Sequence, residues 1–135
     1  MKIIENLKVR DVMTRGVVTV QMDTSVRDVL KTLAEEDITG AVVVAPDGSV
    51  MGVISEMDVV KAFNEDLDRL TAEYIMSDNV KTIRPESTIK EAAEIMKKER
   101  IHRLVIMHEK ESLGIPTLPV GILSVSDIVK LIAGK

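Results

Sequence analysis

An α/β (α+β) fold built from two copies of one small β-α-β-β-α unit is predicted by three features of the sequence. Similar residues recur at a constant separation, two segments show helical spacing of apolar residues, and short apolar runs beside turn residues have the length of strands. The chain has 135 residues, and one copy of about 60 residues is marginally stable alone. We therefore expect the copies to pack sheet to sheet about a pseudo-twofold axis, as one compact module.

The duplication is visible in the spacing of matching residues. Val12-Met13 and Ile75-Met76 are 63 positions apart, and the same separation relates Thr19 to Thr82, Asp28 to Glu91 and Ile38 to Ile101. The separation then becomes 69, relating Gly52 to Gly121, Ser55 to Ser124, Asp58 to Asp127 and Lys61 to Lys130. The second copy therefore holds six more residues, which we place in a longer loop at His108–Pro119. The first repeat is expected at residues 1–66 and the second at residues 67–135.

In each copy, a short strand precedes an amphipathic helix. Strands are expected at Val17–Val20 and Val80–Ile83. Each following helix starts with a capping-box pattern, Ser25-x-x-Asp28 or Thr88-x-x-Glu91. The apolar face of each helix is formed by residues at helical spacing, namely Val26, Val29, Leu30, Leu33 and Ala34 in the first helix and Ile89, Ala92, Ala93 and Met96 in the second.

A hairpin and a second helix complete each copy. Apolar runs at Ala41–Ala45 and Val50–Ile54 flank Pro46-Asp47-Gly48-Ser49, a sequence typical of a hairpin turn. The matching runs of the second copy are Leu104–Met107 and Val120–Leu123. A final helix is expected from about Asp58 in the first copy and from about Asp127 in the second.

Composition argues against several classes of function. The chain is 45% hydrophobic but only 1% aromatic, so the core must be aliphatic and only Phe63 and Tyr74 could stack on bases. The net charge of −4 provides no basic field for nucleic acid or an anionic membrane. The absence of cysteine excludes disulfides, thiolate catalysis and cysteine metal sites. Since no signal-peptide pattern or apolar run of membrane-spanning length occurs, we expect a soluble cytoplasmic protein without nucleic-acid or membrane partners.

Each copy has the same junction between its last strand and its last helix. Gly52-Val-Ile-Ser55-Glu-Met-Asp58 and Gly121-Ile-Leu-Ser124-Val-Ser126-Asp127 both place a hydroxyl and a carboxylate at a helix start. One interpretation is structural, because Ser-x-x-Asp is a capping box whose acid complements the helix dipole. The other is functional, because a carboxylate can accept strong hydrogen bonds from the 2′ and 3′ hydroxyls of a ribose.

A cationic pair, His102-Arg103, stands directly before an apolar strand of the second copy. An arginine fork suits a phosphate group, and a solvated strand end is the alternative interpretation. The corresponding residues of the first copy are Thr39-Gly40. The duplication is therefore not symmetric in charge.

The order of elements, the two Gly-h-h-Ser-x-x-Asp junctions and the run Ile101-His102-Arg103-Leu104 resemble CBS domains, named for cystathionine β-synthase. Gly121–Val129 is similar to the last repeat of the γ subunit of AMP-activated protein kinase. The resemblance extends from about Val9 to Leu131. It implies a tandem regulatory pair with two clefts that each hold an adenosine-containing ligand. AMP, ADP and ATP are expected first, and NAD and S-adenosylmethionine share the same adenosine part.

The resemblance also implies which residues form the clefts. In the Asp127 cleft, the ribose and phosphate would contact Ser124, Ser126 and Asp127, the base would lie among Gly16, Val18, Gly40, Ala41 and Ile122, and Arg103 would reach a phosphate. The Asp58 cleft would use Ser55 and Asp58 with Val53, Asn79, Lys81, His102 and Arg103. Met57 stands where the Asp127 cleft has Ser126, so we expect the Asp127 cleft to be the better site.

We expect a regulatory module and not an enzyme. The two histidines belong to no metal-binding helix motif, and no nucleophile elbow or Walker loop occurs. No catalytic residue, metal or resident cofactor is predicted. A homodimer is expected, since one small module cannot bury every apolar helix face, together with an unidentified regulated protein as partner. The alternative is a protein-interaction adaptor that binds no small molecule.

Overall fold

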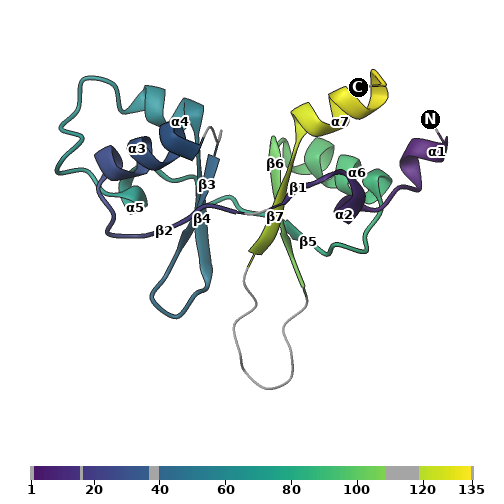
Figure 1. The fold of residues 1–135 in the computed structure, drawn as a ribbon, viewed down its shortest axis with the longest axis horizontal. Helices are drawn as coiled ribbons and strands as arrows, with labels where there is room; N and C mark the ends of the chain where they lie inside the picture. The colour runs from purple at the N-terminus through teal and green to yellow at the C-terminus, as the bar shows by residue number, and fades with distance from the viewer. Residues whose placement is uncertain (1, 16, 37–39, 109–118, 135) are drawn as a thin grey trace. The chain divides into compact units, whose positions relative to one another are not determined.

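Two compact units make up the protein, as seen in a computed structural model that describes residues 2–15, 17–36, 40–108 and 119–134. The terminal unit combines Met1–Val17 with Lys81–Lys135, and the central unit is Val18–Val80. Each unit contains one small sheet with helices on one of its faces (Figure 1). The predicted α/β class with two related halves is therefore confirmed.

The central unit has a three-stranded sheet in the order β2-β3-β4. Strand β2 (Thr19–Gln21) is parallel to β3 (Gly40–Val44), which forms an antiparallel hairpin with β4 (Val50–Ser55). Its helices are α3 (Val26–Glu36), α4 (Glu56–Lys61) and α5 (Ala72–Ile75).

The terminal unit has a four-stranded sheet in the order β1-β7-β6-β5. Its strands are β1 (Thr14–Arg15), β5 (Thr82–Ile83), β6 (Arg103–Met107) and β7 (Pro119–Ser124). Strands β5 and β6 are parallel, and β7 pairs antiparallel with both β6 and β1. Its helices are α1 (Lys2–Glu5), α2 (Val9–Val12), α6 (Ile89–Glu99) and α7 (Val125–Ile132).

The predicted β-α-β-β-α order is present twice, with differences at the ends of elements. The final helices begin at Glu56 and Val125, two residues before the predicted starts, because Ser55 and Ser124 are their N-cap residues. The hairpin turn forms as expected, and Gly48 occupies the left-handed region with φ of 89°. Residues 109–118, most of the predicted long loop, lie outside the described residues.

Each unit has its own aliphatic core. In the terminal unit, Leu104, Ile106 and Leu123 of the sheet pack with the apolar face of α6. In the central unit, Ala41, Val43 and Ile54 of the sheet pack with Val29 and Leu33 of α3. Of the predicted stripe on α3, only Ala34 is exposed, because it lies at the edge of the buried face near the end of the helix.

Short helices from the other sequence repeat complete each unit. The backbone N–H of Val9 at the start of α2 donates to the carbonyl of Ser87 at 2.8 Å, and that of Ala72 in α5 donates to Thr24 at 2.8 Å. Both Val9 and Ala72 are fully buried. Because α2 comes from the first repeat and α5 from the second, the repeats along the chain and the compact units in space do not coincide.

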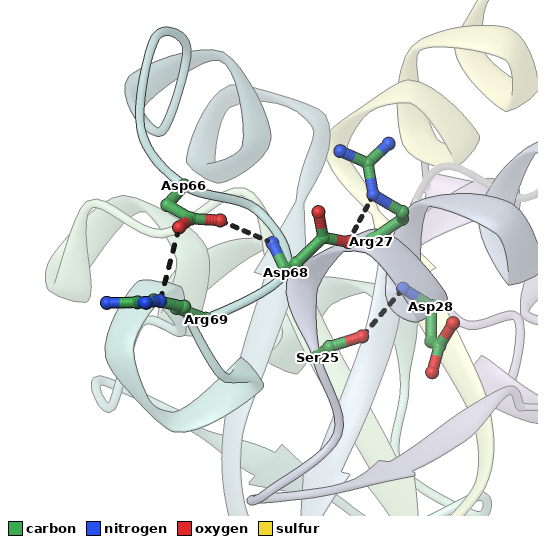
Figure 2. A network of polar contacts seen from close by, with 6 residues as sticks. All are labelled: Ser25, Arg27, Asp28, Asp66, Asp68 and Arg69. Carbon is green, nitrogen blue, oxygen red and sulfur yellow. Dashed lines mark hydrogen bonds and ion pairs between the residues drawn. The ribbon is translucent and has the colours of Figure 1, made fainter.

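A polar network attaches the segment before α5 to helix α3 (Figure 2). Arg27 donates from Nε to Oδ1 of Asp68 at 2.5 Å, and Asp66 accepts from the backbone N–H of Asp68 at 3.2 Å. The Asp68 hydrogen bond and charge raise the pKa of Arg27 above its ordinary value. The network is exposed to solvent, so it guides the path of the segment and contributes little to stability.

Candidate functional site

The end of β7 leads directly into α7 through a complete capping box. Asp127 Oδ2 accepts a hydrogen bond from the backbone N–H of Ser124 at 2.8 Å. In return, Ser124 Oγ accepts from the backbone N–H of Asp127 at 3.1 Å. The capping box that the Ser-x-x-Asp sequence predicts is therefore present.

The cap does not use up the acceptor capacity of Asp127. A carboxylate has about four lone-pair positions on its two oxygens. Asp127 Oδ1 makes no hydrogen bond with any residue that the structure describes. The cap therefore orients the partly buried side chain and uses only one of its two oxygens.

Cationic residues lie at the same end of the terminal sheet as this box. Arg103, the first residue of β6, is the direct partner of Ser124 in the β6–β7 ladder. The carbonyl of His102 accepts from the backbone N–H of Val125 at 2.9 Å, and that of Lys81 accepts from Val105 at 3.1 Å. Arg103 is partly buried and has no ion-pair partner within the described part of the chain. We call Ser124, Ser126, Asp127 and Arg103 the terminal half-site.

The central unit repeats this geometry with different side chains. Asp58 Oδ2 accepts from the backbone N–H of Ser55 at 2.8 Å and from Ser55 Oγ at 3.0 Å. The residue opposite Ser55 across the sheet is Gly40. We call Ser55 and Asp58 the central half-site. The place opposite Ser55 lacks the cationic side chain that Arg103 supplies opposite Ser124.

The helix position before each carboxylate also differs between the half-sites. Ser126 and Met57 both lie exposed in the first turn of their helices, and the Met57 side chain is 60% exposed. The first turn of α7 therefore has a second, exposed hydroxyl, and the first turn of α4 has a thioether at the same position.

The remaining predicted ligand residues fall in both units. Ile122 lies on β7 and Val53 on β4, each on the strand that leads to the capping box. Val18, Ala41 and the exposed Asn79 belong to the central unit, whereas Lys81 and His102 belong to the terminal unit. Gly16 lies outside the described residues. Because each predicted cleft combines residues of both units, the grouping of these residues into two clefts stays a prediction.

The sequence interpretation missed the side chains that fix the strand before each box. A Cβ atom on Gly121 would lie 2.7 Å from Sδ of Met13 and 2.8 Å from the carbonyl oxygen of Thr14. A Cβ atom on Gly52 would lie 2.5 Å from Sδ of Met76 and 2.8 Å from the carbonyl oxygen of Ser77. The sequence did contain a sign of this packing. The pairs Val12-Met13 and Ile75-Met76 recur at the same separation as the two amphipathic helices, so Met13 and Met76 hold equivalent places in the two copies. The junction glycines are therefore needed for close approach of a neighbouring backbone.

Both halves of the chain match the family model of the CBS domain, at residues 9–65 and 72–134. The chain belongs to the CBS domain family. Its two CBS domains form a CBS pair, which is a regulatory module.

Relatives of this CBS pair include longer proteins. An uncharacterized protein of Methanocaldococcus jannaschii, MJ1232, is 36% identical over 98% of this chain and 42% of its own length. A homoserine O-acetyltransferase of Methanosalsum zhilinae is 32% identical over 96% of this chain and 25% of its own length. The chain thus spans less than half the length of these two relatives.

Among solved structures, the CBS domain pair of protein MJ0100 resembles this chain with a TM-score of 0.79 and 25% identity. The similarity covers 95% of this chain and 97% of the MJ0100 pair. That structure is a complex with 5′-methylthioadenosine and S-adenosyl-L-methionine.

Proposed function

We propose that this CBS pair is a regulatory module that senses an adenosine-containing nucleotide, with AMP, ADP and ATP as the expected class. The observation that carries the proposal is the orientation of Asp127 by its cap, with Oδ1 left to accept a ligand hydroxyl. The binding of two adenosine compounds by the related MJ0100 pair supports adenosine as the common part of the ligand.

In this proposal each residue type has a distinct role. The Asp127 carboxylate accepts hydrogen bonds from the ribose diol, and Ser124 and Ser126 support the sugar or phosphate. Arg103 donates to a phosphate oxygen, for which its planar fork is suited. Gly16, Val18, Gly40, Ala41 and Ile122 surround the base.

The second proposed cleft is the weaker one. Ser55 and Asp58 would hold its ribose, with Val53, Asn79, Lys81, His102 and Arg103 around the ligand. The central half-site has Met57 in place of Ser126, so one hydroxyl is lost. Calorimetric titration with AMP is expected to give unequal sites, and two equal, independent sites per chain would contradict this part of the proposal.

A regulatory role without catalysis of its own is proposed for the chain. The match to homoserine O-acetyltransferase covers only a quarter of that enzyme, so the enzyme name does not transfer to the shared segment. The regulated partner is an unidentified protein. S-adenosylmethionine and NAD are the next ligands to test, because they present the same ribose diol.

Self-association as a homodimer is also proposed. Helix α7 leaves Val125, Val129 and Ile132 exposed, and helix α4 of the central unit leaves Met57 and Val60 exposed. Apolar side chains at helical spacing that stay in contact with water are typical of a face that packs against another protein. Sedimentation of the chain is expected to show a dimer, and a monomer at tens of micromolar, roughly the range of a moderate affinity, would contradict it.

The adaptor interpretation remains the alternative, because both capping boxes form without a ligand. Two measurements separate it from nucleotide sensing. Mass spectrometry of the denatured purified protein would identify a retained ligand. AMP or ATP should raise the melting temperature. At a ligand concentration 100 times the Kd, the free energy of unfolding should rise by about 2.7 kcal/mol. No shift with AMP, ATP, NAD or S-adenosylmethionine would favour the adaptor.

A further inference from the structure

The two compact units of the chain carry opposite charge. The terminal unit contains 14 lysines and arginines against 9 aspartates and glutamates, whereas the central unit contains 4 against 13. The net charge of −4 is therefore the balance between a basic unit and an acidic unit. A basic unit attracts anionic partners even when the whole chain is acidic.

The end of helix α6 presents three of these cations to solvent. Lys97 and Lys98 are exposed in its last turn, and the exposed Arg100 is its C-cap residue. None of the three forms an ion pair with a residue that the structure describes. We call Lys97, Lys98 and Arg100 the α6 basic end.

The helix dipole does not account for this cluster. Cations are favourable at the C-terminus of any helix, so the dipole should favour them equally at the end of α3. The first copy instead has Ala34-Glu35-Glu36-Asp37 at the positions of Lys97-Lys98-Glu99-Arg100, and the last turn of α3 has no basic residue. The charge at this place is therefore reversed between two otherwise similar elements.

The backbone of Arg100 is also unusual. Its φ of 55° and ψ of 45° lie in the left-handed region, which glycine adopts at helix ends without strain. An arginine held there adds a third exposed cation beside two lysines. A strained residue of this kind is a reason to look for a functional role of its side chain.

We propose that the α6 basic end is a docking surface for an acidic segment of a partner protein. The inference rests on the proposed function only in taking this partner to be the regulated protein, and the docking itself needs no nucleotide. Nucleic acid fits less well, because the acidic central unit of the same chain would repel a long polyanion. Moreover, Phe63 and Tyr74 both belong to the central unit, so the terminal unit has no aromatic side chain to stack on bases.

The test uses a peptide of ten glutamates as the probe, titrated into the isotope-labelled chain at low salt without nucleotide. Amide chemical shifts should change mainly at residues 97–103. The double variant Lys97→Ala/Lys98→Ala should bind the peptide about threefold or more weakly. Lys2→Ala/Lys90→Ala is the matched control, because it removes two exposed lysines of the terminal unit outside the α6 basic end. It should lose less affinity than the first double variant.

Arg100→Gly separates docking from folding. Glycine suits the left-handed conformation, so the melting temperature should stay the same or rise while peptide affinity falls. Unchanged affinity in Arg100→Gly, equal losses in the two double variants, or shifts spread over all basic residues of the unit would each overturn the proposal. Tighter binding of a ten-residue oligothymidylate through the same residues would overturn it in favour of nucleic acid. A chain that binds the peptide but no adenosine nucleotide would overturn the proposed function and leave the docking surface intact.

Discussion

Arg103 lies directly opposite Ser124 across the β6–β7 ladder. In the central unit, the same place opposite Ser55 is held by Gly40. The two halves of this CBS pair therefore share a backbone arrangement and a carboxylate, and they differ in the cation beside it. That difference gives a way to test phosphate binding separately from ribose binding.

Arg103→Ala should reduce the affinity for AMP and ATP far more than the affinity for adenosine. The substitution removes a charge-assisted contact to phosphate, of roughly 1.5–3 kcal/mol, or about tenfold or more in affinity. Adenosine lacks the phosphate, so its affinity should change little. Calorimetry with the three compounds measures the difference.

Lys90→Ala is the matched control for the loss of a positive charge. Lys90 is exposed near the start of α6, at the opposite end of that helix from Arg103. It should leave all three affinities unchanged. An equal loss of AMP and adenosine affinity in Arg103→Ala would show that Arg103 does not contact the phosphate.

Asp127→Asn should reduce nucleotide affinity about tenfold or more while leaving the ligand-free protein almost as stable. The amide oxygen can still accept from the N–H of Ser124, so the cap survives and the loss is mainly a dipole interaction of about 0.3–1 kcal/mol. The amide nitrogen then replaces Oδ1 and donates where the ribose needs an acceptor. Titration and ligand-free melting measure the two effects.

Asp28→Asn provides a control with the same chemistry. The backbone N–H of Asp28 donates to Ser25 Oγ at 3.2 Å at the start of α3, in a Ser-x-x-Asp sequence with no predicted ligand role. Its substitution should leave AMP affinity unchanged. If Asp127→Asn also leaves the AMP affinity unchanged, Asp127 is only a structural cap. That result would favour the protein-interaction adaptor.

The features that the sequence predicted are those encoded over short distances. The faces of α3 and α6, the turn at Gly48 and the boxes at Asp58 and Asp127 depend on residues within a few positions of one another. Local propensity and spacing are therefore sufficient to find them.

The features that the sequence did not predict depend on contacts between distant segments. Helices α2 and α5 have four residues each, too few to show periodicity, and they are held by backbone bonds to the other repeat. The pairing of Arg103 with Ser124 follows from strand register, which the chain order alone did not provide. The packing of Met13 on Gly121 required both the repeat match and the position of β1 beside β7.

Gly121→Ala should destabilise the protein, because the added methyl group meets the carbonyl oxygen of Thr14 and the thioether of Met13. Overpacking of this kind costs typically about 1–3 kcal/mol. Gly52→Ala should destabilise the protein in the same way, since its added methyl group meets the carbonyl oxygen of Ser77 and the thioether of Met76. Thermal unfolding measures the change, and Ser126→Ala, at an exposed position, is the control. An unchanged melting temperature in both glycine variants would show that the connecting segments move aside easily.

The exchange of α2 and α5 between the repeats predicts which fragments fold. The fragment 18–80 keeps the whole central unit, including the bond from Ala72 to Thr24 and the pair of Arg27 with Asp68. The fragment 1–66 has similar length and contains the first sequence repeat, but it lacks α5. Its core would lose the fully buried Ala72, and the carbonyl of Thr24 would lose its partner.

Far-UV circular dichroism during heating compares the two fragments under the same conditions. Both are small enough to be marginal, so the comparison depends on their difference and not on absolute stability. The fragment 18–80 should show a cooperative transition, and 1–66 should lose its signal gradually. Adding a peptide of residues 67–80 should increase the structure of 1–66, because it supplies α5 and the Asp68 carboxylate. A cooperative transition in 1–66 alone, at the same temperature as in 18–80, would show that α5 is dispensable and that the sequence repeat is itself the folding unit.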